Sequence, residues 1–433
     1  MKWRHFCVAF ALFVGLGLTS IPAAEAELVG EQRTSWGLTT KGSSRTVANF
    51  SALGWGLESM NNQIFVGGNF LDVTNGNQTE RQPYLASFDS STGNWNSGFR
   101  PDVGGPVLAL AASPDGGLFV AGEMRTWNGT RVGPLVKVDP QTGDIWPGWN
   151  TRLSGSTSVV REVSLEPDGN LYAVGRFTRA NNGGNNQPVG SAIRLNPNTG
   201  QIDFSWLPQV NGGSVWGVSA SRTENTVYLA GWFDSVNGTP NQVVGVSGTN
   251  GSQNTWTGFE MNFRCCDNMY DIEATEFGTV LAVGEQHGAY MYDENQNMQL
   301  IKSHITSYDS RFQASNSRRG GDYQEIERVG NRLYATCHCW GQHSSSDAST
   351  PIPFTNDLAD TSGTPTGSAN SIIAYDAASG DRIESFNPPM SGTAGGFGVV
   401  GAPDGCVWVT GSFNTVGAGN ARRPARDLVR LCE

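Results

Sequence analysis

The chain has 433 residues, of which 56 are glycine, 15% are charged and 38% are hydrophobic, and its formal net charge is −11. This hydrophobic content is enough to bury a core, which excludes a disordered chain, and the glycines follow no Gly-X-Y period, which excludes collagen. The negative charge argues against nucleic acid as a partner, because most of the surface would repel a polyanion.

Residues 1–26 have the pattern of a secretory signal peptide. A basic start precedes an apolar run over residues 6–18, and small residues around Ala24 follow. No later stretch approaches the roughly 20 apolar residues that a membrane-spanning helix needs. We therefore expect an extracytoplasmic protein, secreted or at the cell surface, without a transmembrane segment after signal removal. Residues 27–433 are expected to form one domain.

The expected domain consists of seven copies of one unit, each marked by an apolar strand that ends in a small residue. The steps between these marks are 54, 53, 56, 53, 53 and 74 residues. The marks are Gly68, Gly122, Gly175, Gly231, Gly284, Cys337 and Gly411. Each unit holds four strand-like runs separated by turns of Pro, Asp and Gly. The pattern predicts an all-β fold, a seven-bladed β-propeller with four-stranded antiparallel blades, because one such sheet cannot cover both of its faces.

The two ends of the chain are predicted to meet in the seventh blade. The last unit stops after three strand-like runs, and the segment Arg33–Leu38 resembles the outer strands expected around Trp95, Trp149 and Trp206. We predict that this segment supplies the missing outer strand and closes the ring. Cys406 opens one expected strand of this blade and Cys432 ends its antiparallel neighbour, which brings the two together, so a disulfide between them is expected.

The repeated phrases carry a family resemblance. Four phrases of the first unit recur, in less exact form, through all units: Val66-Gly67-Gly68-Asn69-Phe70, Asn75-Gly76, Leu85 to Asp89 and Thr92-Gly93. The chain thus resembles a large group of exported bacterial β-propeller repeat proteins of mostly unassigned activity. The resemblance covers the whole mature chain, implies the fold and transfers no catalytic residue.

A weaker resemblance concerns quinoprotein dehydrogenases. Residues 86–95 and 139–146 look like the tryptophan-docking repeats of those enzymes, and Cys265-Cys266 matches their pair of adjacent, mutually bonded cysteines beside the quinone. Those enzymes typically have eight blades and a calcium site that cannot be assigned here. A Thr-Gly turn and an outer aromatic residue are useful in any propeller, so we predict no cofactor and no metal.

Departures from the repeat gather in the fifth and sixth units, in connections that a propeller places on one face. The sixth unit carries an insertion at about 340–370, which is expected to be a lid or a surface loop. The candidate binding residues of this face are His287, Arg318, Arg319, Asp322, His338, Trp340 and His343.

Four cysteines in the same units allow three interpretations. The first is two disulfides among Cys265, Cys266, Cys337 and Cys339, for which the sequence leaves three pairings open. The second is a metal site of Cys337, His338, Cys339 and His343, although Cys-x-Cys fits zinc spacing poorly. The third is the adjacent-cysteine disulfide of a redox enzyme. The sequence favours the first.

No nucleophile elbow, zinc-protease motif or phosphate loop occurs in the sequence. We therefore expect a non-catalytic binding or structural module that recognises an extracellular glycan, polymer or protein through one propeller face. The alternative is a secreted enzyme, redox or metal-assisted, with its site on the fifth and sixth blades.

Overall fold

The described part of the chain is all-β, as predicted. The computed structural model describes residues 35–44, 53–155, 158–257, 268–285, 288–296, 298–306, 322–347 and 364–432. These residues form small antiparallel sheets and no α-helix; two 3-10 turns occur among them, η1 (Glu294–Gln296) and η3 (Gly419–Ala421). Within these ranges no helix is long and apolar enough to cross a membrane. The expected signal peptide lies outside them.

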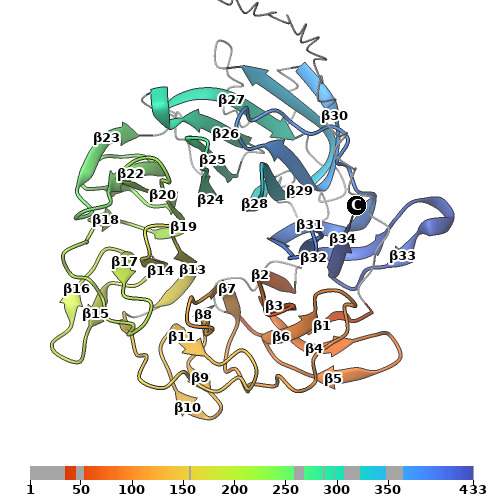
Figure 1. Cartoon of the computed structure of the whole chain (residues 1–433), viewed down its shortest axis with the longest axis horizontal. Coiled ribbons are helices and arrows are strands. Elements are labelled where there is room, and N and C mark those ends of the chain that lie inside the picture. Colours follow the sequence, from red (N-terminus) through yellow and green to blue (C-terminus); the bar gives the residue numbers. More distant parts are fainter. Residues whose placement is uncertain are drawn as a thin grey trace, which may run out of the picture.

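The innermost strands, one from each repeat, lie around a common centre (Figure 1). Each packs against the next in chain order, and the last packs against the first. They are β2 (Gly54–Met60), β7 (Val107–Ala112), β13 (Val159–Leu165), β19 (Ser214–Ala220), β24 (Met269–Ala274), β28 (Tyr323–Val329) and β31 (Met390–Gly401). Each sequence unit therefore supplies one innermost strand, and the strands follow one another around the centre in chain order.

Each innermost strand pairs with a second strand, which is the apolar run recognised in the sequence. These second strands are β3 (Gln63–Gly68), β8 (Leu118–Gly122), β14 (Leu171–Arg176), β20 (Thr226–Trp232), β25 (Thr279–Gly284), β29 (Arg332–Asp347) and β32 (Val407–Val416). The third strands are β6 (Leu85–Asp89), β11 (Leu135–Val138), β17 (Ala192–Leu195), β22 (Val243–Ser247), β26 (Gly288–Asp293), β30 (Thr364–Asp376) and β34 (Leu428–Leu431). Seven hydrophobic clusters of described residues lie between successive sheets, one of them between the seventh and the first.

The outermost strands differ from the prediction. Fourth strands occur in the fourth and fifth units, as β23 (Gln253–Thr257) and β27 (Gln299–Thr306). In four other units the outer segment makes only an isolated bridge, such as Phe88 with Trp95. The prediction of an outer strand at Trp149 is wrong. Pro147 has no N–H to donate to a neighbouring strand, and Gly148 has a φ of +78°, which interrupts an extended backbone. The expected strand at Trp206 is likewise absent.

The N-terminal strand also pairs differently from the prediction. Strand β1 (Gly37–Lys41) pairs with β4 (Phe70–Thr74) of the first unit, not with β34 of the seventh. It still touches the last unit, because the Leu38 N–H donates to the Arg426 carbonyl oxygen at 3.0 Å. The side chain of Leu38 packs in the cluster between the seventh and first sheets. Residues 33 and 34 lie outside the described ranges.

The insertion in the sixth unit is partly strand rather than loop. Strands β29 and β30 extend beyond the length of the other units, and the extension of β29 also pairs with β27. Sheets five and six are thereby joined into one. Residues 348–363, the middle of the insertion, are not among the described ones.

Short strands at the ends of the main strands form smaller outer hairpins. These strands are β5 (Thr79–Arg81), β9 (Thr126–Trp127), β10 (Thr130–Arg131), β12 (Arg152–Ser154), β15 (Arg179–Asn181), β16 (Gln187–Pro188), β18 (Val210–Asn211), β21 (Ser235–Val236) and β33 (Arg423–Pro424).

Candidate functional site

A cavity of about 860 Å³ lies among the innermost strands, and all seven contribute to its wall. Each of these strands carries a β-bulge, where one or two residues stand unpaired opposite the second strand. A bulge redirects a side chain away from the sheet. The two-residue bulges contribute Gly56 and Glu325 to the cavity wall, and each of the seven strands contributes one further bulge residue: Trp55, Leu108, Arg161, Trp216, Tyr270, Gln324 and Phe397.

Four of these seven residues are aromatic, and they contact one another in two pairs. The ring centroids of Trp55 and Phe397 are 4.9 Å apart. Trp216 and Tyr270 stack at 4.7 Å with an interplanar angle of 7°. A fifth aromatic residue, Trp232, lines the same cavity from the end of β20 and is 54% exposed. The cavity therefore offers flat apolar surfaces that water already reaches.

Polar groups hold one of the two aromatic pairs in place. The Arg161 guanidinium carbon lies 4.4 Å from the centroid of Trp216, a cation–π distance. The Tyr270 hydroxyl donates to Glu285 Oε1 at 2.6 Å, and Asn268 Nδ2 donates to Glu285 Oε2 at 2.9 Å. Burial lowers the pKa of Arg161 to about 10, and the charge of Glu123 opposes this shift, so the guanidinium stays cationic at neutral pH.

Carboxyl groups further along the innermost strands have a structural task. An innermost strand has no strand partner on its central edge, so its N–H groups there need other acceptors. Glu58 accepts from Ala112 N at 2.9 Å, Glu162 from Val218 N at 2.7 Å, and Asp271 from Ile326 N at 2.7 Å. In each case the carboxyl group belongs to one sheet and the N–H to the next, so these bonds join neighbouring sheets around the centre.

Burial keeps several of these carboxyl groups protonated near neutral pH. Desolvation raises the pKa of Glu58 and of Asp271 to about 7. It raises the pKa of Glu162 well above its usual value, with Asp271 adding like-charge repulsion. Desolvation and the charge of Glu273 raise the pKa of Glu327 to about 8. Among the described residues no group of three His, Cys, Asp or Glu side chains is arranged to hold a metal ion.

One candidate expected from the sequence, His338, lies beside this cavity, and a second, Asp322, is bonded to it. The backbone N–H of His338 donates to the backbone carbonyl oxygen of Asp322 at 2.9 Å. The ring of His338 lies 4.5 Å from that of Phe397, one of the bulge residues. Both Asp322 and His338 are buried.

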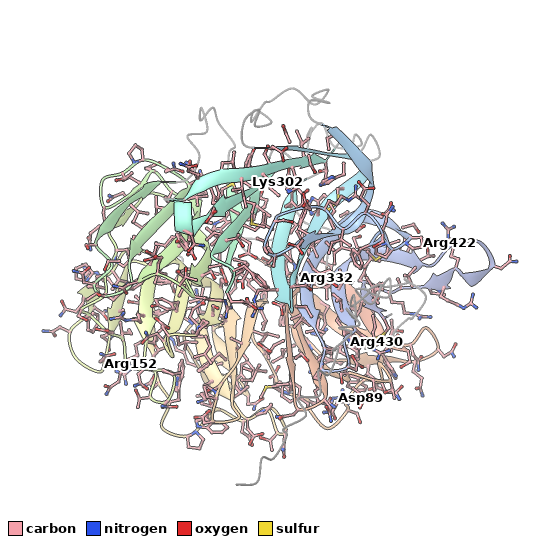
Figure 2. All side chains as sticks on the ribbon, turned by 45° about the horizontal axis from the view of Figure 1, so that its top comes forward. Asp89, Arg152, Lys302, Arg332, Arg422 and Arg430 are labelled. Carbon is pink, nitrogen blue, oxygen red and sulfur yellow. A yellow bond between two sulfur atoms is a disulfide. The ribbon has the colours of Figure 1, made fainter. Side chains whose placement is uncertain are left out.

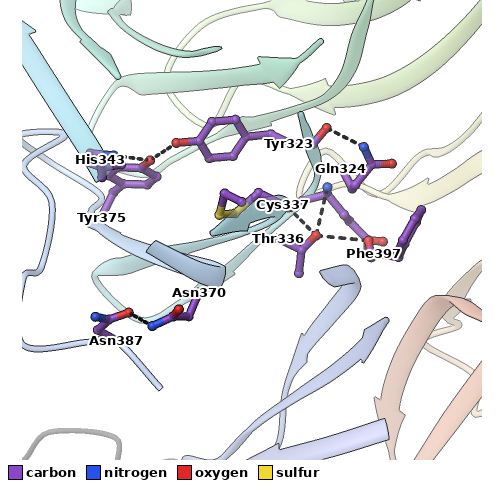
Figure 3. The surroundings of a disulfide bond; sticks show 11 residues. Tyr323, Gln324, Thr336, Cys337, His343, Asn370, Tyr375, Asn387 and Phe397 are labelled. Atoms are coloured by element: carbon purple, nitrogen blue, oxygen red, sulfur yellow. Dashed lines mark hydrogen bonds between the residues drawn. A yellow bond between two sulfur atoms is a disulfide. The ribbon is translucent and has the colours of Figure 1, made fainter. Parts of the chain in front are cut away.

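His343 belongs to a different cluster, which has no access to solvent. Its Nε2 lies 3.1 Å from the Tyr375 hydroxyl, which lies 2.6 Å from the Tyr323 hydroxyl (Figure 3). The ring of His304 lies 4.4 Å from that of Tyr375 at a tilt of 36°, and burial lowers the pKa of His304 to about 3 and the pKa of His343 well below its usual value. Both imidazoles are therefore neutral core groups. Trp340 lies in β29, and His287, Arg318 and Arg319 lie outside the described residues.

The cysteines pair in two places within the described residues. Cys406 and Cys432 form the expected disulfide, with an S–S distance of 2.11 Å. Cys337 is bonded to Cys339, two residues away on the same strand (Figure 3). This excludes the two pairings in which Cys337 and Cys339 are bonded to Cys265 and Cys266, and it withdraws both thiols from the alternative metal site. Cys265 and Cys266 lie outside the described part.

Sequence reasoning missed the seven bulge residues from Trp55 to Phe397, although the repeat contained a signal for them. Each lies 13 to 15 residues before the mark of its unit. At this position the units differ most in chemistry, with Trp55, Leu108, Arg161 and Gln324 in four of them. A variable position next to an otherwise regular apolar strand indicates a residue that points away from the shared core.

A scan against protein-family models found no match to this chain. A search of curated proteins likewise returned no significant match. The functional conclusion therefore depends on the geometry of the cavity.

Proposed function

We propose that this chain is an exported seven-bladed β-propeller that binds a neutral glycan in its central cavity. The blade count is supported by the closed order of contacts among the seven innermost strands and by the hydrophobic layer between the last sheet and the first. Two disulfides are compatible with an oxidising, extracytoplasmic location.

One observation carries the ligand proposal, the convergence of seven bulge residues on a single cavity. Sugar rings have apolar C–H faces and hydroxyl edges, so they need flat aromatic surfaces with a few polar groups beside them. Trp216 and Tyr270 supply one such surface, and Arg161 and Gln324 add donors. Because burial keeps several carboxyl groups of the wall protonated near neutral pH, the wall carries little charge apart from Arg161, which favours a neutral ligand.

An enzyme acting at the fifth and sixth units remains the alternative. In these units Asp271 has a raised pKa but already accepts the Ile326 N–H, as Glu58 and Glu162 of other units accept backbone N–H groups. Catalysis would thus compete with their role in joining the sheets. For this reason we favour binding over turnover.

The proposal is tested by screening the mature chain, residues 27–433, against an array of neutral and charged oligosaccharides. Isothermal titration calorimetry then compares the best ligand on the parent chain, on Trp216→Ala and on the control Phe277→Ala, whose ring is 42% exposed and does not line the cavity. Loss of binding with Trp216→Ala alone is expected. Equal affinity of all three proteins contradicts the site, and hydrolysis or oxidation of the sugar supports the enzyme instead.

A further inference from the structure

A second cavity, of about 1040 Å³, lies between the second and third sheets. One wall comes from β10, β11 and the residues that join them, and the other includes β12. The turn that carries Ile145 and Trp146 also contributes. None of its lining residues belongs to the central cavity. We call this second cavity the basic groove.

The charge of the basic groove is opposite to that of the whole chain. Four of its lining residues are basic (Arg125, Arg131, Lys137 and Arg152) and, among the described residues that line it, none is acidic. The chain as a whole carries −11. A basic groove in an acidic protein attracts anions locally and leaves other surfaces repulsive to them.

Two of the four cations are engaged by the protein and two are not. Lys137 Nζ pairs with Asp115 at 2.6 Å, and Arg125 donates to the carbonyl oxygens of Met124 and Ser158. Arg131 and Arg152 are exposed, and neither guanidinium group has a hydrogen-bond or ion-pair partner among the described residues. Their guanidinium groups are thus available for bidentate pairing with carboxylate or sulfate.

The groove also has an apolar surface beside these cations. Ile145 is 37% exposed. The half-buried ring of Trp146 is held by Lys137, whose Nζ lies 4.9 Å from its centroid. Thr151, which is 6% exposed, lines the groove, and its Oγ1 has no hydrogen-bond partner in the described structure. A buried hydroxyl without a partner is costly, and a bound polar ligand can supply the missing bond.

We propose that the basic groove binds an acidic oligosaccharide, a sugar chain with carboxylate or sulfate groups. Arg131 and Arg152 pair with the anionic groups, and Trp146 stacks on a sugar face. The groove slightly exceeds the roughly 300–1,000 Å³ of most small-molecule sites, which suits a chain of several sugars rather than a single ion. The protein then carries two sites of different charge preference.

Two substitutions test the groove by different physical routes. Arg131→Gln/Arg152→Gln removes two charges, and its matched control Arg422→Gln/Arg423→Gln removes two charges from another surface. Figure 2 shows Arg152 and Arg422 at opposite edges of the molecule. Gly133→Phe fills the groove, since a Cβ at Gly133 would meet a single neighbouring atom within 4 Å, the Thr151 oxygen at 3.8 Å. Thermal unfolding confirms that each variant is folded.

Calorimetry measures the binding of oligogalacturonate, a heparin-derived oligosaccharide, neutral maltohexaose and polyglutamate. We expect the parent chain to bind one of the two acidic sugars and to lose affinity with salt. The arginine variant should bind that sugar about tenfold more weakly, the Gly133 variant should lose it, and the control should be unchanged. The two acidic sugars distinguish carboxylate from sulfate.

Some results would overturn this inference. Absence of binding to both acidic sugars removes the ligand class, and equal binding of polyglutamate shows an acidic peptide site instead. If Trp216→Ala abolishes acidic-sugar binding and Arg131→Gln/Arg152→Gln does not, the ligand sits in the central cavity. The central site is tested separately, by whether the parent chain binds a neutral sugar and whether Trp216→Ala abolishes that binding. The outcome for the basic groove does not decide the outcome for the central site.

Discussion

The guanidinium group of Arg161 lies over the ring of Trp216, with 4.4 Å between the guanidinium carbon and the ring centroid. Trp216 in turn stacks on Tyr270. These residues come from the third, fourth and fifth sheets, so three successive repeats build one continuous surface. A surface shared between sheets depends on their packing, and its ligand affinity should respond to any one of the three side chains.

The first prediction concerns this shared surface. Trp216→Ala removes the central ring and leaves Arg161 without its cation–π partner, so we expect at least a tenfold loss of affinity for the neutral glycan, about 1.4 kcal/mol. Arg161→Met keeps much of the length of the side chain but not its charge, and should give a smaller loss. Calorimetry at constant pH measures both. An unchanged dissociation constant for Trp216→Ala would rule out the central site.

The second prediction is a pH dependence of stability. Glu58 and Asp271 have folded-state pKa values of about 7, and Glu327 of about 8, against usual values near 4. The folded chain therefore holds protons that the unfolded chain releases. The stabilisation is complete below the unfolded pKa values and is lost as the pH rises through 7 and 8. The melting temperature should fall by several degrees from about pH 5 to about pH 8.5.

A matched pair of variants tests the cause of that pH dependence. Glu162→Gln keeps an oxygen that can accept the Val218 N–H but cannot ionise. It should therefore flatten the loss of stability at high pH. Glu162→Ala leaves the N–H without its acceptor and should destabilise the protein at every pH, by about 1–3 kcal/mol. If the parent and Glu162→Gln have the same pH profile, this carboxyl group does not contribute to the pH dependence.

The repeat made the main strands predictable, because the apolar runs at Leu118 and Val407 are set by local periodicity and turn residues. The outer segments were not predictable in this way. A tryptophan such as Trp149 fits an outer strand by composition, but its indole bonds to the next sheet, which only the packed structure shows. The pairing of β1 with β4 is equally non-local. The central cavity was missed because its residues are defined by differences between repeats rather than by what they share.

The third prediction concerns the disulfide between two strands of the seventh unit. Cys406 and Cys432 close a segment with a sequence separation of 26 residues. Cys406→Ala/Cys432→Ala should reduce the free energy of unfolding by about 2–4 kcal/mol, measured by chemical denaturation without reductant. Non-reducing peptide mapping should find this bond and the Cys337–Cys339 bond. A mixed map that links Cys337 or Cys339 to Cys265 or Cys266 would contradict the pairing described here.

The fourth prediction concerns the indoles that connect neighbouring sheets. Trp149 Nε1 donates to the Pro197 carbonyl oxygen at 3.0 Å, and Trp149 is 6% exposed. Trp149→Phe removes this donor and some buried volume, so it should lower the free energy of unfolding by about 1–3 kcal/mol. Trp232→Phe is the control, because Trp232 is 54% exposed and should change stability by less than about 0.5 kcal/mol. Equal effects of the two substitutions in denaturant titrations would show that the bond between Trp149 and Pro197 does not hold the second and third sheets together.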